Sequence, residues 1–167
     1  MADLTTNINY LQPTQFKLVI DRRNYPNLEF FAQSVAHPSV DVQAAELGYK
    51  RLTSVAMPGD KLTFGELSAM IILDEDMNSY TEMYNWLERL VETNNTSLAN
   101  ERDTTKIPTY ADITLSVLTS HSNGNKEVRY IDCVPTSVGT IDFMATAGDV
   151  EYLTFPVSFR FSYFEIK

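Results

Sequence analysis

One segment near the end of the chain constrains the fold more than any other, and it reads Leu-Thr-Phe-Pro-Val-Ser-Phe-Arg-Phe-Ser-Tyr over residues 153–163. Every odd position is large and apolar, and every even position except Pro156 is small, polar or charged. Successive side chains of a strand point to opposite faces, so the pattern predicts one long strand with an apolar and a wet face. Strands usually have about 5–6 residues. A strand this long indicates a larger sheet than a small domain needs, which is typical of a building block rather than an enzyme.

Length and composition indicate a single globular domain covering residues 1–167. Of these residues 44 % are hydrophobic, including nine Phe, nine Tyr and one Trp. The formal net charge of −9 argues against tight binding of a nucleic-acid backbone, because that binding requires Lys and Arg to displace counterions from phosphates. The same charge is compatible with a surface along which DNA slides without adhering.

The sequence shows no sign of export or of a covalent cross-link. Cys133 is the single cysteine, which excludes an internal disulfide, and its strand-like surroundings favour a buried, inert thiol. The first residues lack the charged and apolar regions of a secretory signal. No run approaches the ~18 apolar residues of a membrane span. We therefore expect no membrane anchor.

The remaining pattern predicts a mainly β fold, an antiparallel sandwich or barrel with one flanking amphipathic helix. Asn123-Gly124 marks a tight hairpin turn, because both residues tolerate positive φ angles. The segment 135–139 is expected to interrupt the sheet. Strands are expected at 15–20, 28–35, 40–44, 62–73, 111–117, 127–134, 140–145 and in the final segment.

The helix is the clearest single element. Ser79-x-x-Glu82 is a capping box, in which each side chain satisfies a free backbone N–H at the helix start. Apolar residues then recur at helical spacing on an otherwise polar segment, which Asn94 and Asn95 end. This stripe is predicted to pack the helix on the sheet and consists of Met83, Trp86, Leu87, Leu90 and Val91.

Residues 45–61 show no sustained period and are interpreted as a long irregular loop. Such a loop is uncommon in a compact domain and usually has a function. Two interpretations are open at this point: the loop folds back on its own subunit, or it reaches a partner. The residues of a partner contact would be Leu47, Gly48, Tyr49, Lys50, Arg51, Leu52 and Met57.

No constellation for catalysis or metal binding emerges. His37 and His121 adjoin predicted turns, and neither a Gly-x-Ser-x-Gly elbow nor a phosphate-binding glycine loop is present. Asp74, Asp76 and Asn78 occupy alternate positions as the ligands of a calcium loop do, but Ser79 and Asn85 stand where Gly and a bidentate Glu are required. Acidic residues ahead of a helix instead stabilise its positive end. We therefore expect no catalytic residue, no metal and no cofactor.

Several short motifs occur in a definite order along the chain. They are Phe16-Lys17-Leu18-Val19-Ile20, Ala36-His37-Pro38-Ser39, Gly59-Asp60 before Thr63-Phe64, Leu73-Asp74-Glu75-Asp76 before a helix containing Trp86, Pro135-Thr136-Ser137-Val138-Gly139, and a final strand ending in aromatic and acidic residues. In this order and spacing, the chain resembles the tail tube proteins of contractile-tailed bacteriophages over nearly its whole length.

The resemblance implies a fold and an assembly. Family members share a β-barrel or sandwich and a flanking helix with the hexameric tube proteins of type VI secretion systems. Six subunits join edge to edge, their strands close one inner barrel, and the rings stack into a hollow tube. Such closure removes the exposed strand edges of each subunit. By position, residues 45–60 would contact the neighbouring ring.

The resemblance also implies partners and a location. The chain would assemble with copies of itself and a baseplate initiator, inside a tail sheath. The lumen would hold a tape measure protein and then viral DNA on its way into the host. The protein would be assembled in the host cytoplasm and reside in the virion tail. Arg129 and Arg160 indicate that the tube wall is not uniformly negative. Candidates for lumen-facing residues on the final strand are Ser158, Arg160 and Ser162.

Three alternatives remain open from the sequence. A baseplate initiator or terminator ring would share the fold, although the short chain without an extra domain favours the repeating subunit. A tube of the type VI kind would carry cargo in its lumen. A monomeric β-barrel that binds a small ligand would instead enclose an apolar cavity with a few polar groups.

Overall fold

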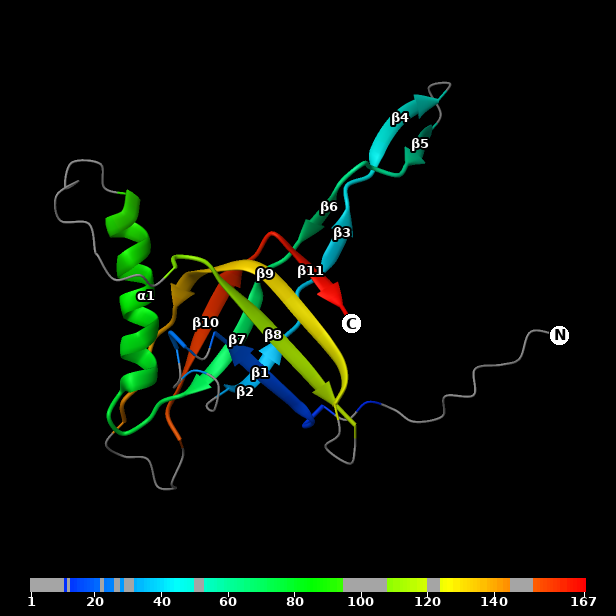
Figure 1. Cartoon of the computed structure of the whole chain (residues 1–167). Coiled ribbons are helices and arrows are strands. Elements are labelled where there is room, and N and C mark those ends of the chain that lie inside the picture. The colour runs from blue at the N-terminus through cyan, green and yellow to red at the C-terminus, as the bar shows by residue number, and fades with distance from the viewer. Residues whose placement is uncertain are drawn as a thin grey trace.

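In the computed structural model, the described residues form an antiparallel β body, a helix along its flank and an arm that projects from one end (Figure 1). The helix α1 (Asn78–Asn94) lies beside the body, and the arm leaves it at the top right of the view. The structure describes residues 11, 13–21, 23–25, 28, 32–49, 53–94, 108–119, 124–144 and 152–167.

The body is one strongly curved antiparallel sheet with the strand order β1-β8-β9-β10-β7-β2. Its two halves share β9, and we call β1-β8-β9-β11 the front sheet and β9-β10-β7-β2 the back sheet. The strands are β1 (Phe16–Ile20), β2 (Ala32–Ala36), β7 (Leu67–Ile72), β8 (Ala111–Leu118), β9 (Gly124–Val138), β10 (Thr154–Arg160) and β11 (Tyr163–Ile166).

The core lies between the inward faces of the two sheets and the helix. Alternating residues of each strand reach it, as the period of two requires. Trp86 is fully buried, and its ring centroid lies 5.9 Å from that of Phe159 on β10. The largest fully buried side chains are Trp86, Tyr25, Tyr130, Phe155, Phe159, Leu18, Ile20, Leu28, Leu67, Ile71, Met83 and Ile113.

The C-terminal segment is bent, which corrects the prediction of one straight strand. β10 and β11 run along the same edge of β9, and Phe161 and Ser162 form a corner between them. The Ser162 amide donates to the Ile131 carbonyl at 3.0 Å, so the pairing continues through the corner. Beyond the corner the alternation shifts: Tyr163 is 46 % exposed, whereas Phe164 packs against the core.

β9 continues through residues 135–138, where the sequence predicted a break. Pro135 has no N–H to donate, but a register shift beside it, between Ser158 and Phe159 of β10, lets the strand accommodate the proline. A second irregularity places Asp132 at φ 54°, opposite the register shift next to Ala111. The strand predicted from residue 140 is wrong for the described residues 140–144, which carry no strand.

The arm replaces the predicted irregular loop. β4 (Ala45–Tyr49) pairs with β5 (Thr53–Met57), and β3 (Val40–Val42) pairs with β6 (Leu62–Phe64) to join this hairpin to the body. The predicted strand 62–73 is therefore two strands, β6 of the arm and β7 of the body. The alternation of apolar and polar residues did not reveal these strands, because a two-stranded ribbon without a covering layer has no buried face to impose a period of two.

The start of α1 also differs from the predicted capping box. The helix begins at Asn78, and Ser79 is its second residue. Asp74 caps the helix: its carboxylate accepts from the backbone amides of Asn78 and Ser79, each at 2.9 Å, and from the Ser79 hydroxyl at 2.6 Å. Burial would raise the pKa of Asp74, but these hydrogen bonds outweigh it and lower the pKa to about 2.

Candidate assembly surfaces

The arm is a narrow ribbon with a tight elbow between its two strand pairs. Gly59 lies at this elbow, where a Cβ atom would stand 1.7 Å from the Gln43 carbonyl oxygen. Only glycine permits so close an approach of the two chains. Near the base, the Gly65 amide donates to the Ser39 carbonyl at 2.9 Å and the Thr63 hydroxyl donates to the Asp41 carbonyl at 3.1 Å. The backbone itself therefore fixes the elbow.

One face of the arm base is apolar and exposed. Val42 lies opposite Leu62 in the register of β3 and β6, and opposed residues of antiparallel strands point to the same face. An exposed group of large apolar side chains typically marks an interaction site. The arm patch consists of Val40, Val42 and Leu62, which are 45 %, 52 % and 57 % exposed, and of Met57 beyond the elbow, which is 47 % exposed.

A second apolar group lies at the opposite end of the body. The arm joins the start of β7, whereas the Leu73 amide, just past the end of β7, donates to the Leu153 carbonyl at 2.7 Å. The Gly139 amide donates to the Pro156 carbonyl, so the segment 140–144 continues toward the same lower end, beside α1 (Figure 1). This foot patch consists of Phe143, Met144 and Tyr152, which are 69 %, 74 % and 77 % exposed.

The outer face of the back sheet is nearly uncharged. Small residues stand side by side across its four strands, since Ser68 pairs with both Ala36 and Ser158, and Ser158 also pairs with Ser137. At one end, Arg160 Nε lies 3.4 Å from a carboxylate oxygen of Glu66. The remaining outward positions of β7 and β10 carry Met, Ile, Thr or Pro. The structure thus offers a wall of mostly uncharged side chains, both polar and apolar, with one ion pair at its end.

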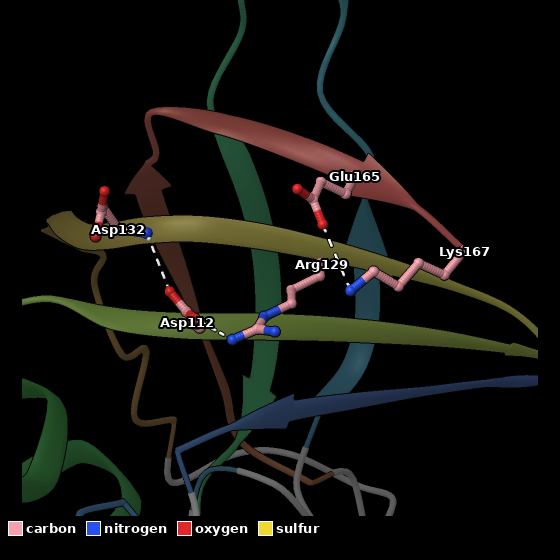
Figure 2. Close-up of polar contacts among 5 residues, drawn as sticks. All are labelled: Asp112, Arg129, Asp132, Glu165 and Lys167. Carbon is pink, nitrogen blue, oxygen red and sulfur yellow. Dashed lines mark hydrogen bonds and ion pairs between the residues drawn. The ribbon is translucent and has the colours of Figure 1, made fainter.

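The front sheet presents a charged outer face instead. Figure 2 shows Arg129 paired with Asp112, whose second carboxylate oxygen accepts from the Asp132 amide at 3.2 Å. The Arg129–Asp112 distance is 2.6 Å, and this hydrogen bond raises the pKa of Arg129. Lys167 pairs with Glu165 at 3.5 Å on the adjoining strand end. These groups are exposed to solvent. Their ion pairs therefore make this face polar but contribute little to the stability of the fold.

The flank of the body is held by the predicted helix stripe, with one exception. Met83 and Trp86 are fully buried and Leu90 packs at the core margin, but Val91 is 72 % exposed, so its predicted packing is wrong for this subunit. Leu87 is half-buried. The Trp86 indole N–H donates to the Thr109 carbonyl at 2.8 Å.

A tyrosine completes this flank. Tyr25 stacks on Trp86, with ring centroids 4.4 Å apart, and accepts a 2.6 Å hydrogen bond from Arg89. Burial raises the pKa of Tyr25 to about 12, although the Arg89 charge opposes the shift. The helix is therefore fixed to the body through aromatic stacking as well as apolar burial.

Neither the arm patch nor the foot patch contains a histidine or a cysteine among its described residues. Cys133 is buried, and burial raises the pKa of its thiol to about 12. His37 is exposed at the base of the arm, and His121 lies outside the described residues. Across the described ranges, no three His, Cys, Asp or Glu side chains group as metal ligands, and no helix is long and apolar enough to cross a membrane.

The predicted interface residues are brought to the arm only in part. Leu47, Gly48 and Tyr49 lie on β4, Met57 ends β5, and residues 50–52 (Lys50, Arg51 and Leu52) lie outside the described residues. The predicted lumen residues Ser158 and Arg160 share the outer face of the back sheet, whereas Ser162 lies at the corner. Of the residues in the two apolar patches, sequence reasoning named only Met57 as a contact residue. The sequence feature that could have indicated the two patches is the presence of large apolar residues in segments too short to form a buried face.

Comparison with known proteins identifies the family. The phage tail tube protein family matches residues 4–167. The tube-terminating cap of an anti-feeding prophage is 14 % identical with a TM-score of 0.68, covering 99 % of this chain and 96 % of that one. The sheath-tube complex of an extracellular contractile injection system gives 14 % identity and a TM-score of 0.67, with 99 % of both chains covered.

A crystal structure of an Hcp protein is more distant. It is 11 % identical with a TM-score of 0.53, and the match covers 91 % of this chain and 98 % of that one. No curated protein matches the sequence significantly. At such low identities the structural likenesses show a shared fold, whereas the family match spans nearly the whole sequence. The chain belongs to the phage tail tube protein family, whose members are structural proteins and not enzymes.

Proposed function

We propose that this protein is the repeating subunit of the inner tube of a contractile phage tail, in which hexameric rings stack head to tail. The observation that carries the proposal is the placement of two exposed apolar patches at opposite ends of one subunit, one on the arm and one at the foot. Contacts between unlike surfaces of identical subunits do not close on themselves and generate open filaments. The arm of one ring would dock on the foot of the next.

Ring formation would use the exposed strand edges. β1 and β2 end the strand order of the body, and β11 pairs with β9 along one edge. An unpaired edge invites pairing with another chain. Neighbouring subunits would pair these edges and close an inner barrel of strands from all six copies. The arm residues Leu47, Gly48, Tyr49 and Met57 would reach the adjacent ring, and we include residues 50–52, which follow β4 in the sequence, in this contact.

The outer face of the back sheet suits the lumen wall. Its exposed side chains near Ser158 are small and uncharged, and Arg160 is neutralised by Glu66. A wall without unpaired cations gives DNA phosphates little to bind, so the tape measure protein and then the viral DNA could pass without adhering. Ser158, Arg160 and Ser162 would face this bore. The sheath would lie outside, the initiator at the baseplate end, and the assembled tube in the virion.

Electron microscopy of the purified, concentrated protein tests the head-to-tail contact. Val42→Asp combined with Leu62→Asp places two charges on the arm patch and should leave rings or monomers while abolishing tubes. Val91→Asp is the matched control, because Val91 is also an exposed valine, at 72 %, but on the helix flank. Tubes of normal length from the arm double variant would overturn the stacking proposal.

A cap or initiator ring is the second candidate. The tube-terminating cap of the anti-feeding prophage has the same fold, so the fold alone does not separate a cap from a tube subunit. A tube subunit should polymerise without limit as its concentration rises. Single rings that persist at high concentration would favour the cap or initiator.

A further inference from the structure

Five rings meet where the arm joins the body. They come from the segment between β2 and β3, from the end of β6, from the middle of β9, from the C-terminal corner and from β11. We call this group the aromatic cluster, and its members are His37, Phe64, Tyr130, Phe161 and Phe164. Tyr130 is fully buried, and Phe161 and Phe164 pack against the core. The cluster therefore has one rigid side, formed by the body.

Each of the two chain segments at the base of the arm contributes one ring to the cluster. His37 lies just before β3, and its Nδ1 is 2.7 Å from the Tyr130 hydroxyl, a hydrogen bond between the two side chains. The His37 ring also meets Phe164 edge-on, with centroids 5.0 Å apart. Such edge-to-face pairs are the favoured arrangement of aromatic rings. The outgoing strand is thus fixed to β9 and β11 at once.

Phe64 does the same for the returning strand. It ends β6, and its ring lies 5.6 Å from Phe161 and 5.4 Å from Phe164, on the two sides of the corner. Phe64 is opposite Val40 in the β3–β6 pair, so its position fixes the orientation of the ribbon face that carries the arm patch. Two contacts on two strands prevent rotation of the ribbon where a single contact would permit it.

The arm has little other support. Among the described residues, the side-chain hydrogen bonds, ion pairs and ring contacts that join residues 37–64 to the body come from His37 and Phe64. One backbone hydrogen bond, from the Gly65 amide to the Ser39 carbonyl, also links the arm to the end of the body ladder. An isolated two-stranded ribbon is at best marginally stable in water. The direction of the arm must therefore depend on its base.

We propose that the aromatic cluster makes the C-terminal strand a positioning element for the arm. Phe161 and Phe164 hold Phe64 and His37, and so β11, about a hundred residues later in the sequence, sets the direction of a ribbon it does not pair with. The value of a fixed arm for stacking rests on the proposed function. The fixation itself is a property of the single subunit and is testable there. Because one edge of β11 is paired with β9, a neighbour that pairs with the other edge would also steady the arm.

A fluorescent label on the arm measures the effect directly. Gly48 is exposed on β4, and a Cβ there would meet nothing within 4 Å, so Gly48→Cys offers a site for a short-linker dye. Cys133 is buried with its pKa raised to about 12, and so the dye reacts with the introduced cysteine alone. Time-resolved anisotropy of the labelled monomer then separates overall tumbling from motion of the arm.

Phe64→Ala and Phe164→Ala are the test variants. Each should raise the amplitude of the nanosecond depolarisation at least twofold. Phe64→Ala removes the attachment of the returning strand, and Phe164→Ala removes the ring that both His37 and Phe64 contact. Tyr80→Ala is the matched control: Tyr80 is also half-buried and also makes an edge-on ring contact, with Phe155 at 5.4 Å, but at the start of α1. It should lower the melting temperature without changing the anisotropy. Equal anisotropy in all four proteins would overturn the proposal, and half-exposed Phe64 keeps the test valid if Phe164→Ala fails to fold.

Electron microscopy of the same variants separates this proposal from the proposed function. A loosened arm with normal tubes would support the cluster's role and contradict arm-mediated stacking. An unchanged arm with lost tubes would contradict the cluster's role alone. His37→Phe refines the result, since it keeps the contact with Phe164 but removes the hydrogen bond to Tyr130, and should give an intermediate amplitude.

Discussion

The body and the arm consist of the same antiparallel strands, but only the body covers them. In the body, the front sheet, the back sheet and α1 enclose a core in which Trp86 and Phe159 are fully buried. In the arm, Val42 and Leu62 face solvent on a ribbon with no second layer. The body can therefore fold as a single subunit, whereas the arm acquires a covering layer only from another molecule. Substitutions in the two regions should separate folding from assembly.

The largest effect is expected in the body. Trp86→Ala removes the side chain on which Tyr25 stacks, together with its hydrogen bond to Thr109, and should cost about 3–5 kcal/mol of unfolding free energy. Urea denaturation followed by circular dichroism measures this cost. Val91→Ala on the same helix should change it by less than about 0.5 kcal/mol, because Val91 is 72 % exposed. Similar losses for the two variants would contradict the core assignment.

A substitution in the arm is expected to disturb assembly rather than folding. Gly59→Ala places a Cβ 1.7 Å from the Gln43 carbonyl oxygen, and a backbone clash of this kind typically costs about 1–3 kcal/mol. Because the elbow is remote from the core, the ribbon should yield locally. The melting temperature should stay near that of the unsubstituted protein, while tubes seen by electron microscopy should disappear.

The control for the elbow is Gly48→Ala on the same arm. A Cβ at position 48 meets nothing within 4 Å in its own subunit, so this variant should keep the shape of the arm and disturb assembly far less than Gly59→Ala. If both glycine variants assembled alike, the tight elbow would not matter for the arm. If Gly59→Ala lowered the melting temperature as strongly as Trp86→Ala, the arm and the body would not be separable.

The same contrast explains how much the sequence could predict. Burial on one face imposed the period of two on 111–117 and on residues 155, 157 and 159, and these strands were found. The arm lacks that burial: a strand was predicted at 40–44, but β4 and β5 were interpreted as a loop and β6 was not separated from β7. The C-terminal corner was missed for another reason. β10 and β11 both pair with β9, and the register shifts near Asp132 and Pro135 of β9 depend on its pairing with strands distant in the sequence. Local patterns do not carry such information.

The helix start shows the same limit over a shorter distance. Ser79 and Glu82 fit a capping box, but Asp74 lies in the turn after β7 and reaches the same amides first. Of the candidate assembly surfaces, only those that the family resemblance implied, the arm contact and the lumen-facing strand, could be predicted from the sequence. The foot patch depends on where the segment 140–144 runs after β9, which the order of residues does not reveal.

A smaller effect is expected at the junction between body and helix. Asp74→Ala removes the cap of α1 and should cost about 1 kcal/mol at neutral pH. Because the folded-state pKa of Asp74 is lowered from 3.8 to about 2, its contribution is present above pH 4 and is lost as the pH falls toward 2. The difference between Asp74→Ala and the unsubstituted protein in urea denaturation should therefore shrink over this range. A difference that stays constant down to pH 2 would contradict the cap.

The smallest effect is expected on the charged outer face of the front sheet. Arg129 pairs with Asp112 at 2.6 Å, but both side chains are more than one-third exposed, so solvent screens the pair. Arg129→Ala should leave the melting temperature unchanged at low and at high salt, whereas Arg89→Ala, which loses the hydrogen bond to buried Tyr25, should lower it. Because Arg129→Ala should not change the stability of the subunit, any effect of this variant on tube formation reports on assembly. If its tubes form at a different salt concentration from those of the unsubstituted protein, the charged face meets a neighbouring molecule, because no loss within the subunit could account for the change.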